Sequence, residues 1–185
     1  VLRGTGPNGL KLRRVLRLGP ADPSLLTETS LGNGGTAAVP VALVARFDLN
    51  PGTENPDVTL VFRRQDGAAS ERQLLRPGAY AAASETYTGA DRPDGGWQLL
   101  NRSMRLTLVN RFANDQVERC TVSWRARGEN RVTLALWSRQ TMLSPGQSLQ
   151  LNADYSLSAP GYDVADFHEA RRTSLPGYPR LQLGN

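Results

Sequence analysis

Apolar and polar residues alternate along most of the chain, and the first clear example covers residues 10–18. The even positions of this segment carry leucine, except for Arg14, while basic residues hold most of the odd positions. A period of two is typical of a half-buried β-strand, because successive side chains of a strand point to opposite faces. Residues 19–23 contain two prolines and predict a turn. We expect a second strand over residues 25–31.

The longest apolar run covers residues 39–49 and follows a glycine-rich turn over residues 32–35. Its odd positions share one apolar face: Val41, Leu43, Ala45, Phe47 and Leu49. Ala42 and Val44 make the start of the opposite face apolar as well. Strands buried on both faces show this pattern, so we expect a central core strand here.

The rest of the chain contains further short segments of the same kind. Residues 58–63 and 72–75 flank an Asp-Gly pair at 66–67, which predicts a hairpin. Residues 77–96 are rich in small residues and proline without a sustained period, and we read them as a long connection. Five more alternating segments follow, at residues 97–100, 104–109, 117–124, 132–137 and 149–157.

Strands at this spacing, with turn residues between them, predict an all-β fold, an antiparallel β-sandwich of about nine or ten strands. We assign it to residues 1–160 as one domain. In the remaining segment, residues 161–185, Asp163 is a plausible N-cap, and acidic residues precede the Arg171-Arg172 pair. This pattern predicts a short helix over residues 163–172, followed by an extended tail.

Composition narrows the class of protein. The chain has 185 residues, and no apolar run approaches the roughly 18 residues that cross a bilayer, so no membrane span is predicted. Cys120 is the only cysteine, which excludes an internal disulfide. The net charge is +5, but the arginines are scattered, so a nucleic acid partner is not favoured. No targeting segment is visible after Val1; the localisation stays open, with a secreted or periplasmic location slightly favoured.

Motifs for catalysis and for cofactors are weak. Residues 4–9 formally match a dinucleotide fingerprint, but a strand rather than a helix follows them, so we expect only a turn. Cys120 lies inside an alternating strand, and no third group orients it with His168, so inert packing is the better interpretation. One histidine and one cysteine supply no metal-ligand spacing. We therefore predict no catalytic residue, no cofactor and no metal.

Acidic residues leave one catalytic alternative open, because glycosidases need only two carboxylates at a suitable separation. The available acids include Asp48, Glu54, Asp57, Glu85, Asp91, Asp94, Glu118 and Asp154. Most of them fall in predicted loops or on solvent faces, where a solvated surface role is the simpler interpretation.

Aromatic residues are the more useful lead, because sugar rings stack on Trp and Tyr. We predict a ligand-binding platform formed by Trp97, Trp124 and Trp137, with Arg125 and Asp94 as hydrogen-bond partners for hydroxyl groups. Tyr80 and Tyr87 are further candidates. Aromatic residues on a half-buried sheet also commonly fill the core, and that alternative stays open.

Three stretches together resemble the galactose mutarotase-like β-supersandwich group, which includes domains of several glycoside hydrolases. They are residues 9–18, residues 26–33 running into 39–49, and Leu136-Trp-Ser138 with residues 143–151. The resemblance implies a partial or trimmed version of that fold. Mutarotases use histidines with a glutamate base, whereas the single histidine here is His168, beyond the last predicted strand. The resemblance therefore implies a non-catalytic role.

Two functional hypotheses follow. The first is a carbohydrate-associated β-sandwich, either a glycan-binding module for a polysaccharide or oligosaccharide or an accessory domain of a sugar-processing enzyme. The second is a structural or assembly subunit of an envelope or multiprotein complex, which docks on a protein partner through residues 162–185. A hydrolase with two close carboxylates is a third class.

Overall fold

The computed structural model describes residues 1–19, 23–52, 56–79, 82–127 and 129–158. Within these ranges the chain forms fourteen strands, no α-helix, and three short 3-10 turns at Pro7–Gly9, Gly89–Asp91 and Asn114–Gln116. Every pairing between these strands is antiparallel. The predicted all-β antiparallel sandwich is confirmed, but the expected number of about nine or ten strands was too low. The predicted helix over 163–172 and the predicted docking tail over 162–185 lie outside the described residues.

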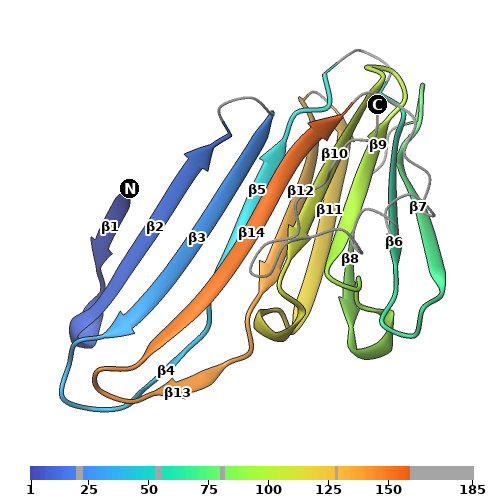
Figure 1. Cartoon of the computed structure of the whole chain (residues 1–185). Coiled ribbons are helices and arrows are strands. Elements are labelled where there is room, and N and C mark those ends of the chain that lie inside the picture. The colour runs from blue at the N-terminus through green and yellow to red at the C-terminus, as the bar shows by residue number, and fades with distance from the viewer. Residues whose placement is uncertain (20–22, 53–55, 80–81, 128, 159–185) are drawn as a thin grey trace.

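A large sheet of eight strands forms one layer of the sandwich (Figure 1). In spatial order its strands are β1 (Leu2–Thr5), β2 (Leu10–Leu18), β3 (Ser24–Asn33), β14 (Ser148–Ser158), β10 (Leu106–Phe112), β9 (Gly96–Asn101), β6 (Val58–Arg63) and β7 (Ala69–Leu75). The outermost strands, β1 and β7, are therefore far apart in space.

A second sheet of four strands packs against the large one. Its spatial order is β5 (Val44–Leu49), β12 (Glu129–Trp137), β11 (Arg119–Arg127) and β8 (Ala82–Thr88). A separate two-stranded ribbon joins β4 (Val39–Val41) and β13 (Thr141–Leu143). Within the described residues, no helix is long and apolar enough to cross a bilayer.

The core lies between the two sheets, and a buried polar pair sits inside it. Trp97 on β9 is directly opposite Asn110 on β10, and both side chains are 0% exposed. The indole Nε1–H of Trp97 donates a hydrogen bond of 2.7 Å to Asn110 Oδ1. Asn110 Nδ2 donates in turn to the main-chain oxygen of Asp154 on β14, at 3.1 Å. One buried amide thus ties three neighbouring strands together.

The prediction of one central strand over residues 39–49 was wrong. The chain breaks at Ala42 and Leu43, so that the first half pairs with β13 and the second half forms β5, an edge strand of the small sheet. Val44 is 44% exposed, whereas Leu43 is buried. The break is stabilised by Ser138, whose Oγ accepts a hydrogen bond from the Leu43 amide. A segment with apolar residues on both faces can therefore form an edge strand, which has a neighbouring strand on one side only.

The long connection predicted over residues 77–96 was also wrong in part, because it contains β8. This strand lies at the edge of the small sheet, and most of its side chains are exposed. Only Glu85 and Tyr87 are half-buried within it. An edge strand with so few apolar residues gives little alternating signal. The short β1 strand at the start of the chain was missed for the same reason, because its four residues are all exposed.

Asp48, on the edge strand β5, makes the stability of this sheet pH-dependent. A hydrogen bond from the Thr133 hydroxyl, and then the neighbouring Arg46, lower the pKa of Asp48. A carboxyl group with a lowered folded-state pKa stabilises the protein above its unfolded pKa of about 3.9 and loses that contribution as the pH falls further.

We expect Asp48→Asn to lower the free energy of unfolding at pH 7 by about 1 kcal/mol or less, because the carboxylate is solvated. The deficit should be smaller at pH 2 than at pH 7, because acid protonates the native carboxyl group and removes the interactions that favour its charged form. Urea unfolding at the two pH values measures it. Thr133→Val, which removes the hydroxyl donor, should flatten the same pH dependence; a deficit that is equal at both pH values would contradict the assignment.

Candidate ligand groove

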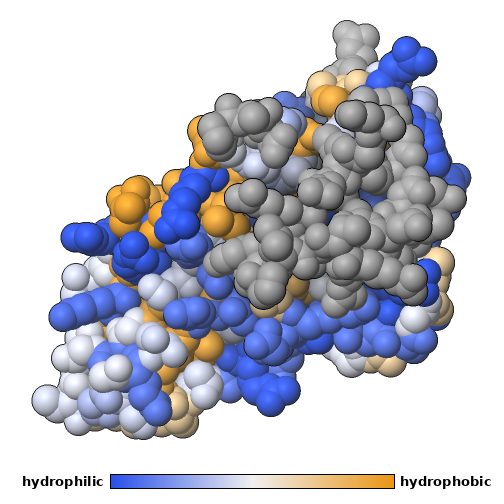
Figure 2. Space-filling view, viewed as in Figure 1, coloured by the Kyte–Doolittle hydropathy of each residue, from blue (hydrophilic) through white to orange (hydrophobic). Residues whose placement is uncertain are grey.

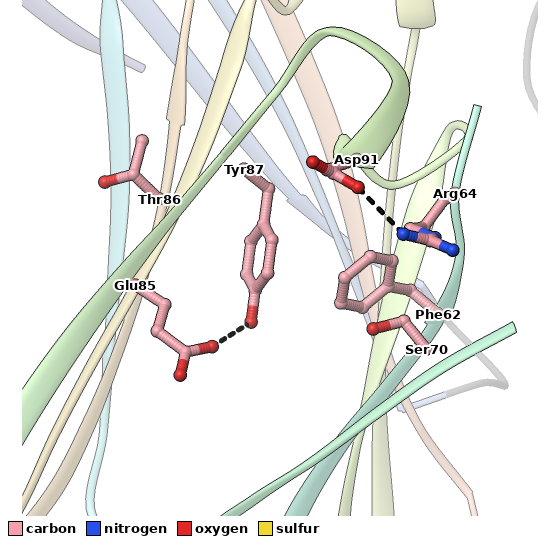
Figure 3. A pocket seen from close by; sticks show the side chains of 7 residues that line it. All are labelled: Phe62, Arg64, Ser70, Glu85, Thr86, Tyr87 and Asp91. Atoms are coloured by element: carbon pink, nitrogen blue, oxygen red, sulfur yellow. Dashed lines mark hydrogen bonds and ion pairs between the residues drawn. The ribbon is translucent and has the colours of Figure 1, made fainter. Parts of the chain in front are cut away.

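A solvent-accessible groove opens at one edge of the sandwich, where β6 and β7 of the large sheet face β8 of the small sheet (Figure 3). It has a volume of about 340 Å³. Its lining residues are Phe62, Arg64, Ser70, Glu85, Thr86, Tyr87 and Asp91. Glu85 and Tyr87 lie opposite the core residues Val122 and Cys120 of β11, so their side chains point inward between the sheets. The groove is therefore an open end of the core, lined by polar groups.

Aromatic rings form the floor of this groove. The ring of Tyr87 meets Phe62 edge-on, with centroids 4.9 Å apart and an interplanar angle of 67°. It also meets the buried Trp97 edge-on, with a centroid separation of 6.5 Å. Such T-shaped pairs are a favoured aromatic geometry. The floor is thus fixed to the centre of the core.

The Tyr87 hydroxyl is held as a donor at the mouth of the groove. It donates a hydrogen bond of 2.6 Å to Glu85 Oε2, and Figure 3 shows this contact. Burial, and then the hydrogen bond to Glu85, raise the pKa of Tyr87 above its ordinary value. Tyr87 therefore stays protonated across the physiological range and can keep donating to Glu85 Oε2. The other carboxylate oxygen, Glu85 Oε1, is the one that contacts Arg72.

Both carboxylates of the groove are paired with arginine. Arg72 Nε lies 2.5 Å from Glu85 Oε1, and Arg64 Nη1 lies 2.8 Å from Asp91 Oδ1. The Arg72 guanidinium also sits 5.8 Å from the centre of the Trp124 ring, a cation–π distance. The groove therefore presents carboxylate acceptors and guanidinium donors side by side, which is a hydrogen-bonding surface.

The structure does not bring the five predicted ligand residues together. Trp97 is fully buried and Trp124 is 6% exposed, and both lie behind the groove rather than on its surface. Trp137 is half-buried and belongs, with the exposed Arg125, to the outward face of the small sheet. Asp94 lies just beyond the 3-10 turn that carries Asp91, and it accepts a hydrogen bond from Asn114.

The outward face of the small sheet holds the remaining predicted tryptophan. The Arg119 guanidinium lies 4.1 Å from the centre of the Trp137 ring, and the indole donates to Thr121 Oγ1 at 3.1 Å. The arginine therefore already occupies one ring face. A sugar would have to displace it or stack on the opposite side.

Sequence reasoning missed the groove because it missed β8. Glu85 and Asp91 were among the acids considered and Tyr87 among the aromatic residues, but no pattern placed them together. Arg64 and Ser70 carried no signal of their own. The one local clue was the spacing of Glu85 and Tyr87, two residues apart, which puts both on the same face of a strand.

A second polar cluster lies on the outer face of the large sheet, where Arg111 is 3.9 Å from Asp154. Burial raises the pKa of Asp154, and the Arg111 charge opposes that shift. Arg111 is only 6% exposed and the adjacent Gln98 only 2% exposed. A ligand could reach these groups only after a rearrangement, so the open groove is the better candidate site.

Cys120, a metal-ligand cluster and His168 are the remaining candidates for chemistry. Cys120 is 0% exposed, and burial raises the pKa of its thiol, as the packing interpretation requires. Within the described residues, no group of three His, Cys, Asp or Glu side chains converges on a metal site. His168 lies outside the described residues.

Comparison of the sequence with models of known protein families and with curated proteins finds no match. The structure does match solved structures. A putative aldose 1-epimerase from Klebsiella pneumoniae aligns with a TM-score of 0.66 at 11% identity over 89% of this chain and 50% of that one. The Slr1438 protein of Synechocystis aligns with a TM-score of 0.65 at 14% identity, over 83% of this chain and 56% of that one.

More distant matches include glycoside hydrolases. The α-galactosidase AgaA of Geobacillus stearothermophilus aligns with a TM-score of 0.53 at 12% identity, over 83% of this chain and 23% of that one. The chain therefore has the galactose mutarotase-like fold, as the sequence resemblance predicted. It spans 50% and 62% of the length of two putative aldose 1-epimerases that it matches, and 56% of the Slr1438 protein.

Proposed function

We propose that this protein is a non-catalytic, carbohydrate-associated β-sandwich that binds a sugar in the groove between β6–β7 and β8. The observation that carries the proposal is the chain of contacts from the Tyr87 hydroxyl through Glu85, which both line the groove, to Arg72 beside it. The carbohydrate-related matches in fold, to putative aldose 1-epimerases and α-galactosidases, support the same ligand class.

The chemistry of the groove suits a sugar. Sugar hydroxyls are donors and acceptors at once, and the groove presents carboxylates, guanidinium groups and the hydroxyls of Ser70 and Thr86. Aromatic rings supply an apolar surface for the C–H faces of the ring. The volume of about 340 Å³ lies at the lower end of the range of about 300–1,000 Å³ for small-molecule sites. We expect the groove to hold a short segment of a glycan.

The ion pairs of the groove favour a non-catalytic role. A glycosidase uses two carboxyl groups that flank the scissile bond and act on it directly. Glu85 and Asp91 are each engaged with an arginine instead. The third hypothesis, a hydrolase with two acids, therefore gains no support from this groove.

Tryptophan fluorescence of the whole chain tests the proposal, because Trp97 contacts Tyr87 and Trp124 lies beside Arg72. We expect a saturable shift with one member of a panel of α-glucans, mannans, β-glucans and α-galactosides. Glu85→Gln, which removes the charge but keeps the shape, should weaken binding about tenfold, equivalent to about 1.4 kcal/mol.

Glu118→Gln is the matched control, because Glu118 is an exposed carboxylate paired with Arg139 on another part of the surface. It should bind with unchanged affinity. Indifference of the emission to every glycan would contradict the proposal, and so would equal affinities of Glu85→Gln and the unaltered protein.

A further inference from the structure

The charge of the protein is concentrated at one end of the sequence. Residues 1–19 contain five basic residues and no acidic one: Arg3, Lys11, Arg13, Arg14 and Arg17. The chain has 22 basic residues in total, so 17 remain elsewhere, and the 17 acidic residues balance them. The net charge of +5 therefore arises entirely from the segment that forms β1 and β2.

β1 and β2 form one end of the large sheet, at the left of Figure 1. β1 pairs with β2 on one side, and no strand of the described residues pairs with its other side. All four of its residues are exposed. An unpaired strand edge presents free N–H and C=O groups, which can bind a further strand.

The two faces of this end differ in composition: one is rich in leucine and also carries Arg14, and the other carries basic residues on either side of the buried Val15. The register places Leu2 beside Arg14, and Leu12, Leu16 and Leu18 share that face of β2. These four leucines are 60%, 40%, 44% and 80% exposed. They continue the core face, because Leu12 and Leu18 lie opposite Leu31 and Leu25, which pack against the core.

The other face is cationic. Arg3 lies directly opposite Arg13, and Lys11 and Arg17 follow on the same face of β2. Glu28 on the neighbouring strand β3 forms an ion pair with Arg17 at 3.2 Å. Figure 2 shows hydrophobic and hydrophilic side chains next to one another at this end of the molecule.

We propose that the free edge of β1 binds an extended strand of a protein partner in which apolar and acidic side chains alternate. Successive side chains of a strand point to opposite faces, so such a strand would place its apolar residues beside Leu2 and its carboxylates beside Arg3. Main-chain hydrogen bonds to β1 would supply the remaining contacts.

Other kinds of partner would contact only one of the two faces at the β1–β2 end of the sheet. A nucleic acid or an anionic bilayer would contact the cationic face and leave the leucines on the opposite face in water. A second copy of this chain, paired antiparallel through its own β1, would bring a second Arg3 towards Arg3, and like charges in neighbouring strands repel. Only a strand added at the edge reaches both faces.

Synthetic peptides test the proposal with the whole chain. We expect a fluorescein-labelled peptide of alternating valine and glutamate to bind saturably by fluorescence anisotropy. A peptide of the same composition with its glutamates in one block should bind at least about tenfold more weakly, as should the alternating peptide N-methylated on every amide, which has no N–H donor left to pair with a strand edge.

The variant Arg3→Glu should weaken the alternating peptide about tenfold, whereas Arg125→Glu, an exposed arginine on the central strand β11, should not. Both positions are exposed, so unchanged far-UV circular dichroism is expected and shows that the fold is intact. Equal binding of the alternating and blocked peptides would overturn the proposal, because it would indicate charge attraction alone. Unchanged affinity of Arg3→Glu would overturn it as well.

Discussion

Replacement of Trp97 by alanine is expected to lower the free energy of unfolding by about 3–5 kcal/mol, the usual range for large aromatic residues in a core. Trp97 is 0% exposed and lies at the centre of the core, in contact with Tyr87 and hydrogen-bonded to Asn110. Truncation leaves a cavity and also leaves Asn110 Oδ1 without its donor. A loss of this size is a large share of the 5–15 kcal/mol that typically stabilises a domain.

Urea unfolding followed by far-UV circular dichroism measures this loss without relying on tryptophan emission. Trp97→Phe separates its two causes, because phenylalanine restores most of the volume but not the N–H donor. An unpaired buried acceptor costs about 1–3 kcal/mol. Trp137→Ala is the matched control, since Trp137 is half-buried on the outer face. An equal loss in Trp137→Ala would contradict the placement of Trp97 in the core.

The second large effect is expected at Asn33, the last residue of β3, which is 2% exposed. Its Nδ2 donates to the main-chain oxygens of Leu143, at 2.7 Å, and Ala37, at 2.8 Å. Its Oδ1 accepts from the Gly35 amide at 2.9 Å. One side chain therefore joins the large sheet, the 34–37 loop and the β4–β13 ribbon.

We expect Asn33→Ala to lower the free energy of unfolding by about 2–3 kcal/mol, because several buried main-chain groups lose their partners together. Asn33→Asp keeps the acceptor but loses both donors and buries a charge, so it should be no more stable than the alanine variant. Asn50→Ala is the control: Asn50 Oδ1 accepts one exposed hydrogen bond from Gly52, and its loss should cost less than about 1 kcal/mol. Similar losses at positions 33 and 50 would be inconsistent with this role.

Much of the fold could be predicted from alternation alone. The segments around Leu10–Leu18, Val58–Arg63 and Ser148–Ser158 are strands, as their period of two requires. The inward position of Cys120 was also predictable, because it falls within an alternating run, and it is buried. The resemblance to mutarotase-like proteins agrees with the fold found by structural comparison.

The layer and the neighbours of each strand were not predictable. Residues 39–49 have the composition of a central strand, yet the chain divides them between a ribbon and a sheet edge. The three tryptophans look alike in sequence, yet Trp97 and Trp124 point into the core and Trp137 points outward. The period of a strand defines its two faces, but which face another sheet covers depends on contacts between distant segments.

The sequence by itself determined the strand-forming segments, the all-β class and the concentration of positive charge in residues 1–19, because each of these is a local property of the chain. Only the tertiary structure decided that the charged segment lies at the outer edge of the large sheet, and that Glu85 and Tyr87 share a groove with Arg64. The groove exists because β8, an edge strand with little apolar character, packs opposite β6 and β7. Long-range strand pairing of this kind has no counterpart in a local pattern of residues.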